Sequence, residues 1–276
     1  MTTLQKVIKY LAMAFAIFLI VTIIGAVLGA AGLLGVLFTK DDSTKEVAIG
    51  DMKTYSITSE IHDLNIQINA ADFYIKDGNA FSVESNLKNL EVADQNGTLT
   101  IKDPTKIKLN TSNVYENAVL TIYIPAGAVF EKVSIHTGAG RFTVDSLSAD
   151  TVDFELGAGD VSIDTLIAEK SADIEGGAGR ITISGGALKN LDLEMGVGQL
   201  NLTSALTGKC RLDLGIGESN ITLTGNREDY KLDLEKGIGN ITVDGKSVSD
   251  YGSSGNGNAK VEINGGIGSI HVRFAQ

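Results

Sequence analysis

The sequence predicts an all-β protein: a single-stranded β-solenoid with coils of about 20 residues, preceded by one N-terminal transmembrane helix. Three observations predict it. A Gly-x-Gly tripeptide recurs at intervals close to 20 residues, alternating apolar and polar runs flank each tripeptide, and an apolar stretch without charges occupies residues 10–38. We expect a cytoplasmic stub at 1–9, the transmembrane helix at 10–38, a linker at 39–56 and an extracytoplasmic solenoid domain at 57–274.

The composition of the 276-residue chain excludes several classes of function. It has 43% hydrophobic residues, 23 Lys and Arg against 34 Asp and Glu, and one cysteine. Because an acidic surface repels phosphate backbones, we expect no nucleic-acid binding. The single Cys210 excludes an internal disulfide, a cysteine-based zinc site and an iron–sulfur cluster. We expect no cofactor.

The first segment, from Tyr10 to Phe38, contains no charged residue. As a helix it would be about 40 Å long, whereas the hydrocarbon core of a bilayer is about 30 Å thick. Lys6 and Lys9 precede the segment and acidic residues follow it, so the positive-inside rule puts the N-terminus in the cytoplasm and the rest outside the cell membrane. A cleaved signal peptide is the alternative, but its apolar region has only about 7–15 residues. We therefore expect a single-pass anchor.

Residues 57–135 show the same alternation with fewer glycines. Asn96-Gly97 predicts a tight turn between two strands, and the run at 120–125 predicts a strand that ends at proline. Residues 103–117 are polar and have no clear period, which indicates an insertion.

The glycine pairs are expected to form sharp corners between strands, because such corners need a positive φ or close packing without a Cβ. They are Gly138, Gly140, Gly157, Gly159, Gly177, Gly179, Gly196, Gly198, Gly215, Gly217, Gly237, Gly239, Gly266 and Gly268. The residue between two glycines is always apolar, and we expect it to point into the core. These residues are Ala139, Ala158, Ala178, Val197, Ile216, Ile238 and Ile267.

Stacked coils would place similar side chains in columns, one strand spacing of about 4.8 Å apart. One predicted column contains Phe142, Val161, Ile181, Leu200 and Ile241. Another contains Phe154, Ile174, Leu193, Leu214, Leu234 and Ile263. A Gly- and Ser-rich loop is expected at 245–259, and Ile270, Val272 and Phe274 predict a final strand that covers the open end of the stack.

Carboxylates recur between the inward positions and should form outward rows. One row contains Asp153, Asp173, Asp192, Asp213, Asp233 and Glu262, and a second contains Glu155, Glu175, Glu194 and Glu235. A solvated face that prevents aggregation of the sheet is one explanation. The functional alternative is that the rows collect divalent cations or a basic partner such as a cationic peptide. We expect no other metal site, because the three histidines are widely separated.

From about residue 57 to 274 the chain resembles the bacterial putative-adhesin domains of unknown function, the family that includes LiaG-like envelope proteins. The matching features are the strand at 120–125, Gly138-Ala139-Gly140, and the Gly-Ala-Gly repeats with alternating strands after it. The resemblance implies a β-solenoid held outside the membrane and an association with envelope stress or adhesion. It supplies no catalytic residues.

We expect a non-catalytic, membrane-tethered interaction or scaffold protein of the bacterial cell envelope, acting in stress response or adhesion. Its partner would be an envelope protein, a cationic peptide or a cell-wall component. An accessory regulator that contacts another membrane protein through Gly25 and Gly29 is one alternative. The other is a polysaccharide-active β-helix enzyme, whose acids and bases would come from Asp103, Lys106, Lys108 and Asp250.

Overall fold

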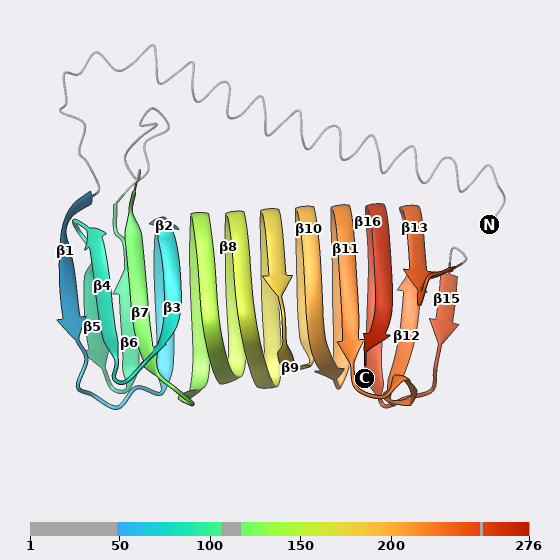
Figure 1. Ribbon diagram of the computed structural model, residues 1–276, viewed down its shortest axis with the longest axis horizontal. Coiled ribbons are helices and arrows are strands. Elements are labelled where there is room, and N and C mark those ends of the chain that lie inside the picture. Colours follow the sequence, from blue (N-terminus) through green and yellow to red (C-terminus); the bar gives the residue numbers. More distant parts are fainter. Residues whose placement is uncertain (1–48, 106–116, 249–250, 276) are drawn as a thin grey trace, which may run out of the picture. The chain divides into compact units, whose positions relative to one another are not determined.

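A computed structural model describes residues 49–105, 117–248 and 251–275, which form an all-β domain (Figure 1). The all-β prediction is confirmed. Within these ranges the helical structure consists of one short 3-10 helix, η1 (Arg227–Asp229). No helix in the described part of the chain has the length and apolarity needed to span a bilayer. The expected stub at 1–9 and anchor at 10–38 lie outside the described residues.

The central coils are stacked parallel strands. They are formed by β8 (Val129–Ile183), β9 (Gly186–Lys189), β10 (Leu191–Thr207) and β11 (Lys209–Thr224). β8 is continuous because its chain bends at the glycine corners without leaving the sheet. β10 pairs in parallel with β8, Leu193 opposite Ile174, and β11 pairs with β10, Leu212 opposite Leu193. Each coil therefore lies against the next in a common register.

Seven strands form the N-terminal end of the stack. They are β1 (Ile49–Ser56), β2 (Asp63–Ala70), β3 (Asp72–Gly78), β4 (Ser82–Leu87), β5 (Glu91–Gln95), β6 (Thr98–Lys102) and β7 (Val119–Pro125). β2 and β3 pair in parallel with β8, and β6 and β7 add to them in parallel. The antiparallel strands β5, β4 and β1 complete this end. β1 lies within the residues expected as a linker, because the edge of β4 offers it backbone partners.

The last strand of the chain lies inside the stack, not at its end as expected. The C-terminal strands are β12 (Tyr230–Glu235), β13 (Ile238–Val243), β14 (Lys246–Ser247), β15 (Tyr251–Ser254) and β16 (Ala259–Ala275). β16 is inserted between β11 and β13, with Ile267 opposite both Ile216 and Ile238 (Figure 1). The coil of β12 and β13 is therefore the outer one. β14 and β15, within the expected loop, pair with it in antiparallel fashion.

Leu214 in its predicted column and Asp213 in its predicted row are each two residues away from the position that the sequence indicated. Leu212, not Leu214, lies opposite Leu193, and Asp213 lies opposite Glu194. Leu191-Asp192-Leu193 and Leu212-Asp213-Leu214 have the same pattern, but the first ends three residues before its corner glycine and the second ends one residue before it. Shifting β11 by two residues against β10 keeps apolar residues opposite apolar residues. The pairing in the structure shows the true register, in which the corner glycines of the two strands are aligned.

The interior is filled by aliphatic side chains and a small aromatic group. Phe142 stacks on Phe73 with ring centroids 4.7 Å apart, and its edge contact with Phe154 has a centroid distance of 6.0 Å. All three rings are buried. They lie where the N-terminal sheets join the first coil, so they tie the two parts into one core.

Glycine is required at both corner positions because adjacent coils nearly touch there. The second glycine has a positive φ, 142° at Gly198. A Cβ on Gly198 would lie 1.7 Å from the carbonyl oxygen of Gly179, and a Cβ on Gly196 would lie 2.4 Å from that of Gly177. No side chain fits at such distances, so the corner consists of backbone alone.

The apolar residue between the glycines points outward, which corrects the prediction that it enters the core. Val197 is 51% exposed and Ile238 is 42% exposed. The left-handed second glycine turns the chain at the apex and interrupts the alternation, so the buried positions on either side are Met195 and Leu200. The seven middle residues form one outward file along the corner, in the spatial order Ala139, Ala158, Ala178, Val197, Ile216, Ile267 and Ile238.

Candidate functional site

The segments that precede the glycine corners present a carboxylate face, which we define by two outward rows. The first row is Ser134, Asp153, Asp173, Asp192, Arg211, Glu262 and Asp233. The second row is His136, Glu155, Glu175, Glu194, Asp213, Asn264 and Glu235. The structure thus brings together the predicted acidic residues, but Asp213 belongs to the second row and Arg211 occupies its place in the first.

The middle of this face is an unpaired block of four carboxylates. Asp192 lies opposite Asp173, and Glu194 lies opposite Glu175. Within the described ranges no Lys, Arg or His forms an ion pair with any of the four, although Arg211 lies opposite Asp192 on the next strand and its charge acts on it at longer range. Partial burial raises the pKa of Asp173, and the charges of Asp192 and Asp153 raise it further. Like charges on adjacent strands repel, so the block opposes folding.

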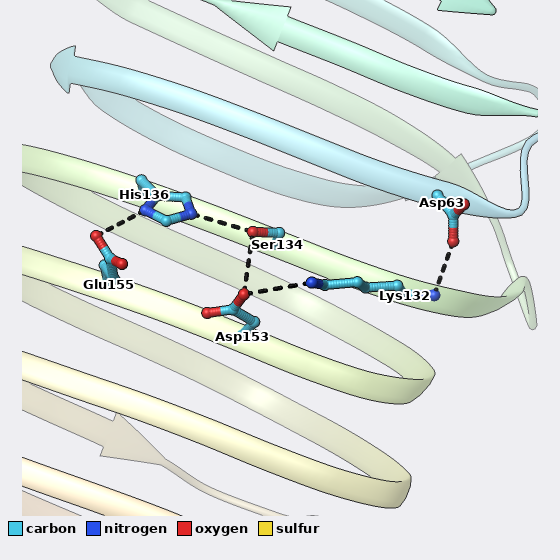
Figure 2. A network of polar contacts seen from close by, with 6 residues as sticks. All are labelled: Asp63, Lys132, Ser134, His136, Asp153 and Glu155. Carbon is cyan, nitrogen blue, oxygen red and sulfur yellow. Dashed lines mark hydrogen bonds and ion pairs between the residues drawn. The ribbon is translucent and has the colours of Figure 1, made fainter.

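At the N-terminal end of the face, Lys132 and His136 lie against carboxylates of the two rows (Figure 2). His136 Nδ1 is 2.7 Å from Glu155 Oε2, and its Nε2 is 3.1 Å from Ser134 Oγ. Ser134 Oγ donates a hydrogen bond of 3.4 Å to Asp153, whose carboxylate is also 3.6 Å from Lys132 Nζ. This network is exposed to solvent and contributes little to stability. It bounds the unpaired block on one side.

At the C-terminal end the charges are again compensated. Arg211 Nε donates a hydrogen bond of 2.8 Å to Asp213, and its Nη1 is 3.8 Å from Glu262 Oε1. Asn264 Nδ2 donates to the other oxygen of Asp213 at 2.7 Å. Burial alone would raise the pKa of Asp213, but the hydrogen bonds from Arg211 and Asn264 outweigh it and lower the pKa. The carboxylate of Asp213 is held in its ionised form.

A row of three lysines lies beside this C-terminal group. Lys260 is opposite Lys209 on one side and Lys231 on the other, and Lys231 Nζ is 3.7 Å from Asp233. The carboxylate face is therefore basic or balanced at both ends. Its uncompensated negative charge is confined to the unpaired block in the middle.

The segments that follow the corners present a different surface, which we call the amide face. Asn220 Nδ2 donates to Asn201 Oδ1 at 3.2 Å, and Asn201 Nδ2 donates to Thr182 Oγ1 at 3.4 Å. Nearer the corner, Arg180 Nη1 is 3.3 Å from Asp160 Oδ1. Polar side chains on this face thus pair with one another from coil to coil.

The spacing of the carboxylates bears on the choice between a divalent cation and a basic partner. In the part of the chain that the structure describes, no three His, Cys, Asp or Glu side chains are grouped closely enough to hold a metal ion. Carboxylates in a row leave the sheet in the same direction at a spacing of about 4.8 Å, whereas a bound calcium ion needs oxygens converging to within about 2.6 Å. The geometry favours a basic partner over the divalent cation.

Asp103 has a structural role. It is 5% exposed, and its carboxylate accepts hydrogen bonds from Asn69 Nδ2 at 3.3 Å and from the backbone N of Thr105 at 3.0 Å. These bonds tie the carboxylate to its own loop and to β2. The other residues considered for an enzyme lie outside the described residues: Lys106, Lys108 and Asp250.

Cys210 and the remaining histidines do not form a catalytic group. Burial raises the pKa of the Cys210 thiol, and Sγ contacts the carbonyl oxygen of Thr207 at 3.3 Å. A buried thiol with a raised pKa is a poor nucleophile. His271 Nδ1 lies 2.9 Å from Thr242 Oγ1 on the amide face, while His62 lies near the turn at Gly97.

Two features of the surface were not anticipated from the sequence: the hydrogen-bonded amide face and the outward file at the corner. The signal for the first is present, because Thr182, Asn201 and Asn220 each lie five residues after the first glycine of their pair. For the second there is no signal, since an apolar residue at a corner is equally compatible with an inward side chain.

Similar solved structures cover most of the chain at low identity. A "putative adhesin" from Bacteroides fragilis is 15% identical, with a TM-score of 0.47, and the match covers 80% of this chain and 96% of that chain. A "putative adhesin" from Parabacteroides distasonis is 15% identical, with a TM-score of 0.39, covering 81% of this chain and 98% of that chain. A "putative lipid binding protein" from Parabacteroides distasonis is 13% identical, with a TM-score of 0.30, covering 82% and 98%.

No curated protein matches the sequence. A family of domains of unknown function does match, and it spans the described strands from β1 through β16. The match begins at residue 53 and ends at residue 273. The chain belongs to the Toastrack DUF4097 family.

Proposed function

We propose that this protein is a non-catalytic interaction module of the bacterial cell envelope, and that its carboxylate face binds a cationic partner. The observation that carries the proposal is the unpaired block. Four carboxylates face each other across two coils, and none of them forms an ion pair among the described residues. The charge of Arg211, opposite Asp192 on the next strand, offsets only part of their repulsion. A cationic ligand would supply the missing counter-charges and would relieve the repulsion.

The amide face supports this proposal, because it shows which outward side chains stabilise the stack of coils. Both faces belong to the same strands and share the same register through the corner. On the amide face, Asn201 and Asn220 stabilise the stack by bonding to each other. The fold could use the same ladder on the carboxylate face, yet Asp173 and Asp192 occupy the opposed positions there. A repulsive pair in a place where a stabilising pair fits indicates a use outside the domain.

We propose further that residues 10–38 anchor the chain in the cell membrane with the domain on the outside. The support is the length of the uncharged segment and the lysines before it. A role in envelope stress or adhesion would follow from that location, and among the expected partners a cationic peptide matches the charge of the face. Extraction of the full chain from membranes by alkaline carbonate would argue against the anchor.

Binding of oligolysine tests the cationic-partner proposal. The full chain in nanodiscs of zwitterionic lipid should bind a fluorescent oligolysine, and the affinity should fall as salt rises, because the contacts are exposed ion pairs. The double variant Asp173→Asn/Asp192→Asn should bind about three- to tenfold more weakly. Fluorescence anisotropy with empty nanodiscs as the blank measures both effects.

The matched control is Asp160→Asn, which removes a carboxylate from the amide face. Its oligolysine affinity should stay within about twofold of wild type, since Asp160 is already paired with Arg180. Equal weakening by this control and by the double variant would mean that only the net charge matters. That result, or no oligolysine binding at low salt, refutes the proposal.

A further inference from the structure

The C-terminal half of the corner carries a continuous line of branched apolar side chains on its outside. We call it the corner ridge, and it consists of Val197, Ile216, Ile267 and Ile238. These residues lie opposite one another on adjacent strands. Val197 and Ile238, at the two ends, are 51% and 42% exposed. Four contiguous branched side chains on one edge are more than the scattered apolar residues of an ordinary surface.

The fold does not require large side chains at these positions. In the other half of the same corner the equivalent residues are alanines, Ala139, Ala158 and Ala178, and the coils there stack with the same glycine geometry. Alanine is therefore sufficient for the corner. Valine and isoleucine add apolar surface that is exposed at Val197 and Ile238 and half-buried at Ile216 and Ile267, and the exposed part favours a contact with another molecule.

A small hollow lies beneath the same corner. It is lined by Ile216, Ile238 and Ile267 together with the core residues Met195 and Leu214. Lys236 also lines it.

The border of the ridge is acidic at its Val197 end. Glu194 precedes Val197 by three residues on the same strand, and with Glu175 it forms the edge of the unpaired block. On the other border, Glu218 lies two residues after Ile216. The ridge is thus an apolar strip with the unpaired block at its Val197 end and Glu218 on its other side.

We propose that the corner ridge, with the carboxylates on its border, binds a cationic amphipathic segment. This deepens the proposed function and rests on it. Apolar side chains of the segment cover Val197, Ile216 and Ile238, while its lysines or arginines reach Glu194 and Glu175. The two contacts are separate in the structure, so a basic segment without apolar residues would gain only the second.

The charge distribution favours this occupant over a lipid surface or a second copy of the chain. Residues 41–276 contain 20 Lys and Arg and 34 Asp and Glu, a net charge of 20 − 34 = −14, which anionic headgroups repel. Two copies packed ridge to ridge would bring acidic borders such as Glu194 and Glu218 close to each other, which is unfavourable.

The test compares two synthetic peptides that carry the same number of lysines: an amphipathic leucine–lysine helix and an oligolysine. Wild-type full chain in zwitterionic nanodiscs should bind the leucine–lysine peptide at least about tenfold more tightly than oligolysine, after subtraction of binding to empty nanodiscs. The variant Val197→Ser/Ile238→Ser should lose this difference and retain its affinity for oligolysine. The control Val129→Ser/Met52→Ser, which removes two hydrophobic residues that are 62% and 56% exposed elsewhere, should keep the difference.

Several results would overturn the inference while leaving the proposed function intact. One is equal affinity of wild type for the two peptides, with oligolysine binding still weakened by Asp173→Asn/Asp192→Asn. Another is a serine variant that binds the leucine–lysine peptide as wild type does. If the serine variant had a lower oligomer mass than wild type, the ridge would bind a second copy of the chain. If the serine variant no longer pelleted with anionic vesicles as wild type did, the ridge would bind lipid. Absence of oligolysine binding would instead refute the proposed function itself. Circular dichroism confirms that each variant is folded.

Discussion

The carboxylate face and the amide face are two sides of the same coils. Polar side chains of adjacent coils attract each other on the amide face, whereas those in the middle of the carboxylate face repel each other. On the amide face Asn220 bonds to Asn201, and Arg180 lies beside Asp160. On the carboxylate face, Asp173 and Glu175 are matched by further carboxylates. Since backbone, register and strand spacing are shared, the difference arises from side chains alone. Outward positions on adjacent coils can thus hold hydrogen-bonded pairs that stabilise the fold. A face with opposed carboxylates at such positions is a candidate for binding a partner.

The largest effect is expected where the two faces meet. Gly198→Ala would place a Cβ 1.7 Å from the carbonyl oxygen of Gly179 and would also impose a positive φ on alanine. The corner would have to open and the register of both faces would be lost. We expect a loss of at least about 4 kcal/mol in the free energy of unfolding, measured by urea denaturation.

The variant Gly225→Ala is the control that separates two effects of Gly198→Ala, the steric contact of the new Cβ and the strain of a positive φ. Gly225 also has a positive φ, 104°, but nothing lies within 4 Å of a Cβ built there. Its replacement should cost about 1 kcal/mol. If Gly198→Ala were no more harmful than this control, close coil contact at the corner would not be what holds the two faces in register.

An intermediate effect is expected when the amide face is made to resemble the carboxylate face. Asn201→Asp/Asn220→Asp replaces a hydrogen-bonded pair by two opposed carboxylates and should lower the free energy of unfolding by about 1–2 kcal/mol at pH 7. The reverse change, Asp173→Asn/Asp192→Asn, should raise it by up to about 1 kcal/mol. Both effects should shrink in 1 M salt. A stabilised Asn201→Asp/Asn220→Asp variant would contradict the contrast between the faces.

The smallest effect is the pH dependence that Asp173 contributes. Its pKa in the folded state is raised above the ordinary value of 3.8, so the folded state binds the proton more tightly than the unfolded state. Stability should therefore fall as pH rises from 3.8 through the folded pKa, and this fall should be absent in Asp173→Asn. Thermal unfolding of both proteins between pH 4 and pH 7 measures it.

Asp213 has the opposite pH dependence from Asp173, because its pKa in the folded state is lowered. Its contribution to stability is present above 3.8 and is lost as pH falls through the folded pKa, which lies below the chosen range. If the difference in stability between wild type and Asp173→Asn did not change between pH 4 and pH 7, the raised pKa of Asp173 would be contradicted.

Much of the fold follows from local patterns. Alternation of apolar and polar residues predicts strands with one buried face, and the recurring glycines predict corners about 20 residues apart. The inward positions Phe142, Ile181 and Leu200 are buried as those patterns require. The acidic rows are equally visible, since an outward residue between two inward ones has only one side of the sheet on which to lie.

The rest depended on contacts between residues far apart in the chain. The insertion of β16 between β11 and β13 leaves the period unchanged, because every coil presents the same free edge and any of them can accept the last strand. The place of Asp213 depended on pairing with β10, and the outward direction of Val197 depended on how closely the glycine backbones approach. Alternation is a property of neighbouring residues in one strand, whereas register, strand order and the curvature of the corner arise from packing between strands. For that reason the chain's own pattern predicted the rows of side chains, and the folded molecule alone revealed which rows are unpaired and where the apolar ridge lies.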